Sequence, residues 1–441
     1  MSGADTPPSP DGLPILGHGV AFSRNPVKAM ESWAEYGDVV HLQFLGESMY
    51  LVTHPDLIKQ ILVEEQHKFT IGPEQQETFA GVEDHAMTTA TGDQWRRLRR
   101  AAHPAFTRER IAEYGDRMAA VTAQFVDEWD DGEQFDLHAE MRRLTVQILG
   151  ETLLNEDLRG QEDVVIDAAD ALVDRTNFRR PGQLLPDWIP TPTDRRFRRT
   201  VQRLDTLVDE IVEERQGATG EASDDVCAVL LAAHREGDLT LTEVKQNLVA
   251  FLLAGHESPS GVLTRVWYLL ERHPDVYESL CDEYNRVVSD DRPGIEQYDA
   301  LEYTQRVVAE TLRLYPPTTG VNRQAIESIT LDGYELPEGA RFLIPQWVPH
   351  RDERFWDAPE TFDPDRWERN IDRPEYAYFP FSGGPRGCPG NDFARQELTL
   401  MLATMVGRVD LDVVADDQLT FIPSVQLRPA TNINAEVRRA G

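Results

Sequence analysis

Cysteine is rare in this chain, and its rarity limits the kind of protein that the sequence encodes. Only Cys227, Cys281 and Cys388 occur among 441 residues. A small, odd number of cysteines in a long chain argues against a disulfide framework and favours a reducing compartment. The three cysteines form no Cys-x-x-Cys pair and no zinc-like cluster with histidine. The sequence therefore argues against a disulfide-stapled secreted domain and a zinc finger.

Long hydrophobic runs are also missing. The stretch that opens the chain, MSGADTPPSPDGLP, has no apolar run, so it fits neither a signal peptide nor a membrane anchor. No run of about 18 apolar residues occurs further along. We expect residues 1–12 to be a disordered tail, and we expect a cytoplasmic protein without a membrane anchor.

Positive charge is scarce, and the few lysines are Lys28, Lys59, Lys68 and Lys245. Lys and Arg number 44 against 77 Asp and Glu, which gives a net charge of −33. Such a surface repels nucleic acid and anionic membranes. The acidic residues are spread along the whole chain, so we interpret them as an adaptation to concentrated salt, where screening weakens self-repulsion, rather than as a docking face. This interpretation suggests an extreme halophile, and full stability in dilute buffer would contradict it.

Helical periodicity dominates the chain. It runs from about residue 95 to 314 and returns near Gly390, whereas alternating strand patterns are confined to three stretches, at 39–52, 325–344 and 418–436. Residues 69–92 show no steady period, which predicts a long loop of the kind that often carries function. We find no internal repeat. We therefore predict a mainly α fold with a minor β part, in which residues 13–441 form a single domain.

A lone cysteine in a loop rich in glycine and proline is the most informative feature. The loop, FSGGPRGCPG, spans residues 381–390 and leads into the helix predicted near Gly390. A thiolate, not a thiol, binds metal, and the free N–H groups of a helix N-terminus favour a thiolate. Because Pro389 has no N–H, we expect Gly390 and Asn391 to donate to the Cys388 sulfur.

The other residues of the loop fit a flat, anionic ligand. Gly383, Gly384 and Gly387 let the backbone approach such a ligand closely. Arg386 is placed to bind an anionic group on it. The alternative is a buried structural cysteine in a turn, but that alternative does not explain Phe381, the glycines and the arginine together.

This loop resembles the haem loop of the cytochrome P450 family, Phe-x-x-Gly-x-Arg-x-Cys-x-Gly. The matching residues are Phe381, Gly384, Arg386, Cys388 and Gly390. The resemblance implies a single triangular, helix-rich fold that binds haem b. It also implies that Cys388 is the proximal ligand of the haem iron.

Two further motifs of that family occur in the expected order. AETLRLYPP places Glu310 and Arg313 on one helix face, at i and i+3, and FDPDRW supplies Arg366. In the family, this arginine joins the Glu–Arg pair behind the cysteine loop, so the role that the resemblance implies is structural.

A third motif lies in WRRLRRAAHPAF. Trp95 and Arg99 share a helix face at i and i+4, and the resemblance implies that they bind haem propionates, together with Arg323 of GVNRQA. The other arginines of the run belong either to a solvated helix face or to a basic patch for an acidic electron donor: Arg96, Arg97 and Arg100.

The segment FLLAGHESPSG, residues 251–261, resembles the oxygen-binding stretch of the family's long central helix. The resemblance implies that Ala254 and Gly255 leave room for dioxygen. It also implies that Glu257 and Ser258 form an acid–alcohol pair that relays protons through water. We interpret His256 as a polar neighbour of this relay rather than as a metal ligand.

Two departures from the family pattern bear on proton delivery. Ser258 stands where the family usually has threonine, so the hydroxyl is kept but the stiff β-branched side chain is lost. Pro259 cannot donate to the carbonyl of Gly255, which predicts a kink at the oxygen site. The alternative is that the helix ends at Ser258–Pro259.

The resemblance implies a monooxygenase that activates dioxygen at haem and hydroxylates a small, mostly apolar substrate. Only 441 − 388 = 53 residues follow Cys388, so we expect electrons from an external ferredoxin or flavoprotein. The alternatives are a haem-thiolate enzyme that uses peroxide or rearranges its substrate, and a non-catalytic haem sensor. Fatty acids, terpenoids and sterol-like molecules all remain candidate substrates. The expected pocket draws on residues 69–92, 178–194, Phe251, Ala254, 318–321 and 424–425.

Overall fold

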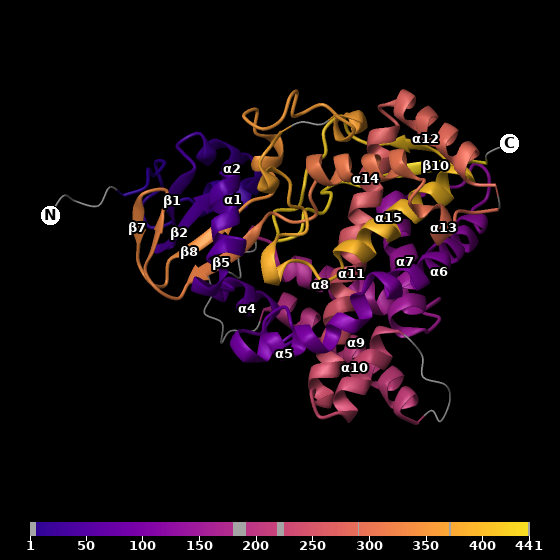
Figure 1. Ribbon diagram of the computed structural model, residues 1–441, viewed down its shortest axis with the longest axis horizontal. Coiled ribbons are helices and arrows are strands. Elements are labelled where there is room, and N and C mark those ends of the chain that lie inside the picture. The colour runs from indigo at the N-terminus through magenta and orange to yellow at the C-terminus, as the bar shows by residue number, and fades with distance from the viewer. Residues whose placement is uncertain (1–5, 180–190, 218–224, 290, 370–371, 440–441) are drawn as a thin grey trace.

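The computed structural model describes residues 6–179, 191–217, 225–289, 291–369 and 372–439. Figure 1 shows two unlike halves: a strand-rich part that holds the N-terminus, and a larger helical part that holds the C-terminus. The mainly α architecture with a minor β part is as the sequence predicts. The helices are α1 (Gly19–Arg24), α2 (Pro26–Ala34), α3 (Pro55–Lys59), α4 (Pro73–Phe79), α5 (Gly92–Ala102), α6 (Arg108–Asp127), α7 (Leu137–Leu149), α8 (Glu162–Thr176), α9 (Pro192–Gly217), α10 (Val226–Arg235), α11 (Leu241–Leu270), α12 (Pro274–Val287), α13 (Ile295–Tyr298), α14 (Glu302–Leu314) and α15 (Asn391–Val406).

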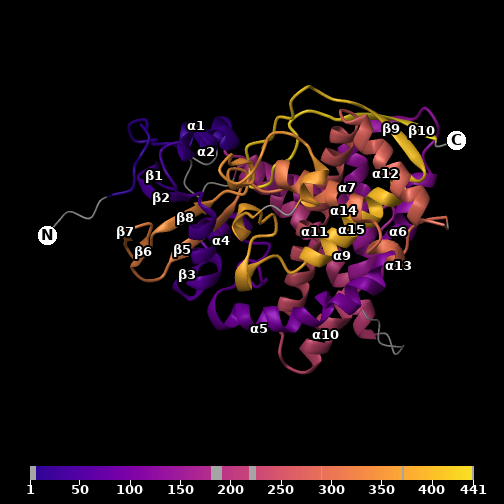
Figure 2. The ribbon, with the colours of Figure 1, turned by 45° about the horizontal axis from the view of Figure 1, so that its top comes forward.

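The strands form one larger sheet and two small ones. Their order in the larger sheet is β1-β2-β8-β5-β3, and β4-β10-β9 and β6-β7 form the others. Figure 2 shows β9 and β10 beside α12, at the end of the molecule away from the larger sheet. The strands are β1 (Val39–Phe44), β2 (Glu47–Val52), β3 (Phe69–Thr70), β4 (Gln134–Asp136), β5 (Val321–Ala325), β6 (Ile329–Leu331), β7 (Tyr334–Leu336), β8 (Arg341–Ile344), β9 (Val409–Val414) and β10 (Asn434–Arg439).

The alternating pattern predicted at 39–52 forms a hairpin that turns at Gly46. β1 pairs antiparallel with β2, with Phe44 opposite Glu47. The two turn residues between them, Leu45 and Gly46, both have positive φ, at 51° and 89°. A two-residue turn of this kind matches the right-handed twist of the flanking strands, so it fixes the register of the pair.

Helix α11 passes through the helical part and packs against α7, α14 and α15. It is buried on nearly all sides because its sequence is apolar around most of its circumference. A capping box between Thr240 and Glu243 starts it. Arg97 of α5, one of the arginines that the sequence offered for a basic patch, is paired with the Glu243 carboxylate of this helix.

Two predictions about the N-terminal half need correction. Residues 1–5 lie outside the described residues, but the predicted tail is ordered from Thr6 onward: the carbonyl of Pro8 accepts a hydrogen bond from the N–H of His41, at 2.8 Å. Prolines lack the N–H that strands need, yet their carbonyls still accept. Residues 69–92 are not a continuous loop, because Pro73 starts helix α4. The sequence of this helix, PEQQETF, is polar and so shows no apolar residues at helical spacing.

The Glu310 carboxylate holds together segments that are distant in sequence. Its oxygens accept from Arg313 Nε and guanidinium N–H groups at 2.9 and 2.8 Å, and from Arg366 Nε at 2.8 Å. Trp367 Nε1 donates to the same carboxylate at 3.0 Å. Glu310, Arg313 and Arg366 are all buried, and Arg313 also donates to the carbonyls of His350 and Pro359. α14 is thereby tied to the stretch that precedes the cysteine loop.

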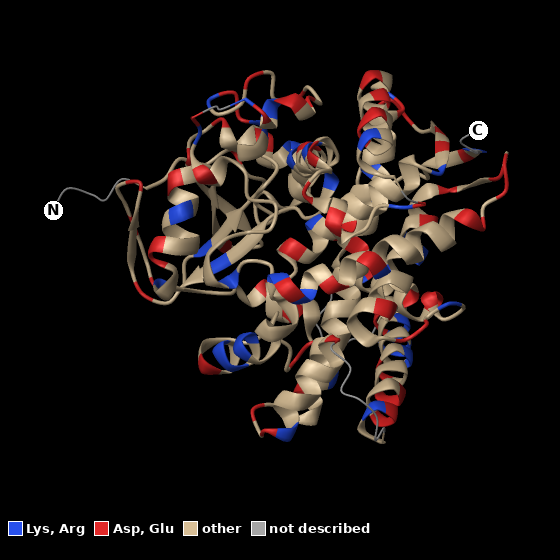
Figure 3. Cartoon of the chain, turned by 45° about the vertical axis from the view of Figure 1, so that its right-hand side comes forward, with Lys and Arg blue, Asp and Glu red and all other residues tan. Residues whose placement is uncertain are grey.

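Charged side chains lie over the whole molecule, with red acidic residues on most elements in Figure 3. This distribution matches the even spread of acidic residues along the sequence, and no single acidic face stands out in that view. None of the helices in the described part of the chain has the length and hydropathy needed to cross a membrane.

We predict that Glu310→Gln lowers the free energy of unfolding by about 3–5 kcal/mol, because two buried guanidinium groups lose their counter-charge. Denaturant titration of the haem-loaded protein measures this loss. Arg159→Gln is the matched control, since it breaks the exposed Asp157–Arg159 pair, and we expect that variant to unfold like the parent. Equal midpoints for Glu310→Gln and the parent would contradict the structural role of this network.

Candidate active site

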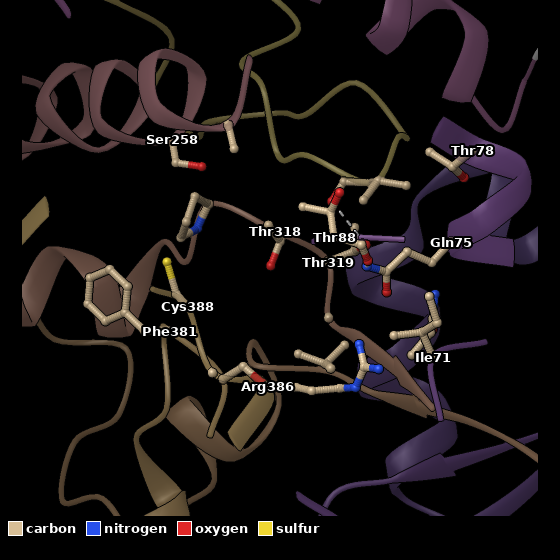
Figure 4. Close-up of a pocket in the computed structure, with 18 of the residues that line it drawn as sticks. Ile71, Gln75, Thr78, Thr88, Ser258, Thr318, Thr319, Phe381, Arg386 and Cys388 are labelled. Carbon is tan, nitrogen blue, oxygen red and sulfur yellow. Dashed lines mark hydrogen bonds between the residues drawn. The ribbon is translucent and has the colours of Figure 1, made fainter. Parts of the chain in front are cut away.

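A cavity of about 710 Å³ lies between the strand-rich and helical parts. Its wall is formed by α4, α5, α11, β5, the cysteine loop and the start of α15. In Figure 4, Ser258 and the sulfur of Cys388 lie on one side, and Gln75, Thr78 and Ile71 lie on the other. The volume falls in the range of sites for small molecules and cofactors.

The Cys388 sulfur faces into this cavity. The side chain is exposed, and it lines the cavity. Burial raises the pKa of the thiol, while the Gly390 N–H that bonds the sulfur and the Arg99 charge act in the opposite direction. Gly390 is therefore confirmed as a donor to the sulfur. The Cys388 N–H donates to the carbonyl of Phe381 at 2.9 Å, which closes the loop on itself.

Two of the three glycines that the sequence assigned to ligand approach, Gly383 and Gly384, serve protein packing instead, whereas Gly387 lines the cavity as expected. Gly384 has a φ of +65°, and a Cβ there would lie 1.9 Å from the carbonyl oxygen of Leu62. A Cβ at Gly383 would lie 2.2 Å from the hydroxyl oxygen of Tyr376. Neither glycine lines the cavity. Gly390 does line it, and a Cβ there would meet only the Cys388 sulfur, at 4.0 Å.

Arginines without carboxylate partners converge on the cavity. Trp95, Arg99, Arg323 and Arg386 all line it. Arg323 donates to the carbonyl of Asn322, and Arg386 donates to the carbonyl of Ala90; among the described residues neither they nor Arg99 form an ion pair. Burial lowers the pKa of Arg323 and of Arg386 to about 10 in each case. Uncompensated positive charge at this place predicts an anionic ligand.

Trp95 belongs to the same cluster, and its indole ring also contacts Arg386. The Arg386 guanidinium lies over the Trp95 ring, with 4.4 Å between its central carbon and the ring centroid. A cation over an aromatic face is attracted by the ring's quadrupole. The structure therefore brings Arg386, which was predicted to bind an anionic group, together with the three residues that the resemblance assigned to propionate binding.

Three of the four oxygen-site residues predicted on α11 reach the cavity. Ala254, Gly255 and Ser258 line it, as does Pro259. The helix continues unbroken to Leu270, so the alternative that it ends at Ser258–Pro259 is wrong. Because Pro259 has no N–H, the carbonyl of Gly255 lacks its usual helical donor.

Glu257 is the exception, and its placement corrects the predicted acid–alcohol relay. Among the described residues that line the cavity, Glu257 is absent. Its two oxygens accept from the Nε and a terminal N–H of Arg428, both at 2.7 Å, and Arg142 Nε lies 3.5 Å away. Although burial raises the pKa of Glu257, Arg428 and Arg142 outweigh it and hold that pKa well below its usual range. This carboxylate stays ionised and is poorly placed to donate a proton.

His256 stays neutral beside Glu257. Burial lowers the pKa of His256 to about 4. Its Nδ1 lies 2.9 Å from the carbonyl of Leu252, which accepts, so Nδ1 carries the proton. Nε2 lies 3.6 Å from the Glu257 carboxylate. His256 is thus a polar neighbour of Glu257, as predicted, but it does not line the cavity.

No motif or spacing in the sequence identifies the residues that pair with Glu257. Arg428 lies 171 positions away and also binds Asp170 of α8, at 2.6 Å; Arg142 of α7 binds the same Asp170. Arg142, Asp170 and Arg428 lie in three separate segments, so only the packed fold brings them together. Sequence spacing predicts contacts within one helix, not pairs of this separation.

The remainder of the cavity matches the expected substrate region. Phe251, Thr318, Thr319, Val321 and Val425 line it, as do Ile71, Gln75, Phe79 and Thr88 of the 69–92 segment. Phe69 packs in the core instead. Of the expected 178–194 region, Phe178 lines the cavity, and residues 180–190 lie outside the described residues.

The cytochrome P450 family model matches residues 7–434, and the chain belongs to this family. It is 32% identical over 96% of its length to cyclooctatin synthase of Streptomyces melanosporofaciens, covering 91% of that protein. It is 30% identical to cyclooctat-9-en-7-ol 5-monooxygenase of the same organism, over 91% of this chain and 88% of that protein. It is also 30% identical to pentalenene oxygenase of Streptomyces avermitilis, over 92% of both chains.

Membership of this family makes the protein a haem-dependent oxidoreductase, a monooxygenase that incorporates one atom of dioxygen. The residues present fit iron protoporphyrin IX. The cavity offers one thiol for the iron and, for the two propionates, three arginines that are buried or half-buried and form no ion pair with a described residue. Ala254, Gly255 and Ser258 of α11 line the same cavity as the sulfur, and Figure 4 shows Ser258 and Cys388 at one side of it.

We predict that Glu257→Gln lowers the free energy of unfolding by about 3–5 kcal/mol at neutral pH, because Arg428 and Arg142 lose a buried counter-charge. The folded-state pKa of Glu257 is depressed, so its contribution is fully present above the unfolded value near 4.5. The contribution is lost as pH falls below that value toward the folded pKa. The denaturant midpoints of the parent and of Glu257→Gln should therefore converge as the pH is lowered from neutral to acid.

Asp412→Asn is the control for this experiment, since it removes one partner of the exposed Asp412–Arg438 pair. Its midpoint should follow that of the parent at every pH. A Glu257→Gln variant as stable as the parent at neutral pH would show that the carboxylate is not held as the geometry indicates.

Proposed function

We propose that this protein hydroxylates a cyclic, mostly apolar terpenoid, using electrons from a separate ferredoxin or flavoprotein. The observation that supports it most is the cavity in which one cysteine sulfur, a cluster of unpaired arginines and an apolar chamber meet. Bound haem would supply the chemistry that activates dioxygen, and the protein would supply the thiolate, the orientation and the protons.

Each part of the haem pocket has a proposed role. Cys388 is the proximal ligand, and the Gly390 N–H steadies its sulfur as thiolate. Electron density from a thiolate favours cleavage of the O–O bond. Trp95, Arg99, Arg323 and Arg386 bind the two propionates by hydrogen bonds and charge. Phe381 closes the loop beside the sulfur, and Gly384 keeps it packed on Leu62.

The distal side leaves space for dioxygen and substrate. Ala254 and Gly255 have small side chains where α11 borders the cavity. Ser258 supplies a hydroxyl on the same face, so it is the proposed final proton donor. Glu257 does not donate; its role is to fix α11 against α7 and α8 through Arg142, Arg428 and Asp170.

The lining favours a terpenoid over a fatty acid. Phe22, Phe44 and Phe178 give the outer part of the cavity broad aromatic surfaces. A fatty acid needs a free cation for its carboxylate, and Arg341 at this end is paired with both Glu47 and Glu74. The relatives named above act on cyclic terpenoids, which supports the same class for this chain.

Isotope labelling tests this function. The haem-loaded protein is mixed with a ferredoxin, a ferredoxin reductase and NADPH under ¹⁸O₂. The substrates tested are pentalenene, cyclooctat-9-en-7-ol, a long-chain fatty acid and a sterol. We expect a hydroxylated product with one ¹⁸O atom from a terpenoid, and only when the electron donor is present.

Other outcomes of this experiment favour the alternatives. Product formed with hydrogen peroxide and without a donor would support a peroxide-using enzyme. Unlabelled, isomerised product would support a rearrangement. Spectral binding of haem ligands without any turnover would support a sensor. Hydroxylation of the fatty acid alone would overturn the proposed substrate class but keep the reaction.

A further inference from the structure

The side chain of Gln346 is buried, and the two ends of its amide have different partners. It is 2% exposed. Its Nε2 donates to the carbonyls of Phe379 and Pro380, at 3.1 and 2.9 Å. A carbonyl can only accept, so these two bonds fix which end of the amide is nitrogen and which is oxygen. The amide oxygen, Oε1, is thereby turned toward Thr318.

The hydroxyl of Thr318 therefore has a fixed direction. Its Oγ lies 2.7 Å from Gln346 Oε1. Because an amide oxygen has no proton to give, the Thr318 hydroxyl must donate in this bond. Thr318 lines the cavity, and Figure 4 shows it between the sulfur of Cys388 and Gln75 of α4. What Thr318 offers to a ligand is thus a lone pair and not a proton.

Two other threonines of the cavity wall also give their hydroxyl protons to the protein. Thr319 Oγ donates to the carbonyl of Val425, at 3.2 Å. The Thr88 hydroxyl donates to the buried carboxylate of Glu83. Burial raises the pKa of Glu83 to about 7, so above that pH the carboxylate can only accept. Thr88 and Thr319 both line the cavity, so they offer lone pairs to a ligand as Thr318 does.

A wall of this polarity discriminates among the oxygen groups that an apolar molecule can carry. A hydroxyl brings a proton, so it can donate to a lone pair of the wall. A ketone or an ether brings lone pairs alone, so its oxygen would face another acceptor with no proton between them. A polar group left unpaired in an apolar site costs free energy, which is why a site built for one hydrogen bond rejects analogues that cannot form it.

We propose that Thr318 accepts a hydrogen bond from a hydroxyl group that the substrate already carries, and that Gln346 positions Thr318 to do so. The substrate is then a terpenoid alcohol and the product a diol. Substrate, dioxygen, two electrons and two protons give the diol and one water. This substrate class rests on the terpenoid hydroxylation proposed above and narrows it.

The same chemistry gives the enzyme a place in a reaction sequence. The reaction that supplies its substrate must put the first oxygen on the ring skeleton. An earlier hydroxylation does this, and so does a cyclisation that ends by capturing water.

Binding of three matched ligands to the haem-loaded protein tests the role of Thr318. Cyclododecanol, cyclododecanone and cyclododecane share one apolar ring and differ only in the oxygen group. The change in haem absorption during titration gives each dissociation constant. Thr318→Val keeps the shape of the side chain and removes the hydroxyl. We expect it to weaken the binding of cyclododecanol about tenfold, the effect of roughly one hydrogen bond, and to change the binding of the other two ligands less than about twofold.

Further variants separate recognition of the alcohol from packing. Thr318→Ser keeps the hydroxyl, so it should bind cyclododecanol like the parent. Gln346→Leu leaves the Thr318 hydroxyl free to donate, so we expect cyclododecanone to bind more tightly than it does to the parent. Thr330→Val is the control, since it makes the same change on the exposed part of strand β6. It should bind all three ligands like the parent.

Three results would overturn the proposal for Thr318: no binding of cyclododecanol by the parent, an equal loss for the alcohol and the ketone in Thr318→Val, or unchanged binding of the alcohol in that variant. The last result would show that water alone meets the lone pair. Unchanged binding of the ketone in haem-loaded Gln346→Leu would overturn the positioning role of Gln346. If that variant does not bind haem, the two Thr318 variants still decide the question.

These titrations need neither dioxygen nor electrons, so they are independent of the proposed reaction. Recognition of the alcohol by Thr318 stands even if the ¹⁸O₂ experiment gives no labelled product. Conversely, a labelled terpenoid product together with no effect of Thr318→Val would leave the reaction in place and remove the role of Thr318.

Discussion

Burial of the Cys388 sulfur is the constraint on which the site depends. A thiol inside a protein resists ionisation, and here burial raises its pKa. A thiolate forms only where positive charge and N–H donors offset the loss of water. The Gly390 N–H and Arg99 supply part of that compensation, and an iron cation would supply the rest. The loop, the start of α15 and the cavity shape all serve to keep this sulfur buried but directed at a ligand.

The buried ionisable side chains of this protein fall into three cases, which differ in the partners that surround them. Glu310 and Glu257 are neutralised by arginines, and they fix segments that are far apart in sequence. The arginines of the cavity lack carboxylates among the described residues, as expected where an anionic ligand supplies the charge. Glu397 has neither a cation nor a hydrogen-bond donor among the described residues, and burial raises its pKa. Structural support and anion binding are thus assigned to different residues.

Much of this site was predictable because its contacts are local. The offsets within residues 381–390 place the sulfur, its donor and the helix start in one turn, and the i, i+3 spacing of Glu310 and Arg313 fixes their pairing. The hairpin at Gly46 follows from its alternating strands. In the same way, local spacing placed Trp95 and Arg99 on one face of α5, and that face borders the cavity.

Contacts between distant segments were not predictable. An acid followed by an alcohol suggested a relay, but the direction of the Glu257 side chain depends on Arg428, 171 residues away. Glu397 lies in a helical sequence, RQELTL, and only the packing of α15 reveals that no described residue binds its carboxyl group. Helix α4 was not predicted because its sequence shows no apolar residues at helical spacing. The order at the start of the described chain was not predicted because it depends on a proline carbonyl that accepts a hydrogen bond from β1.

The absorption spectrum of the reduced, haem-loaded protein with carbon monoxide tests the central claim most directly. Thiolate ligation gives a strongly red-shifted Soret band, and we expect that band in the parent and its loss in Cys388→Ala. Cys281→Ala, which changes a cysteine outside the cavity, should leave the band in place. A Soret band typical of histidine-ligated haem in well-folded parent protein would contradict the assignment of Cys388, and with it the account of how this cavity activates dioxygen.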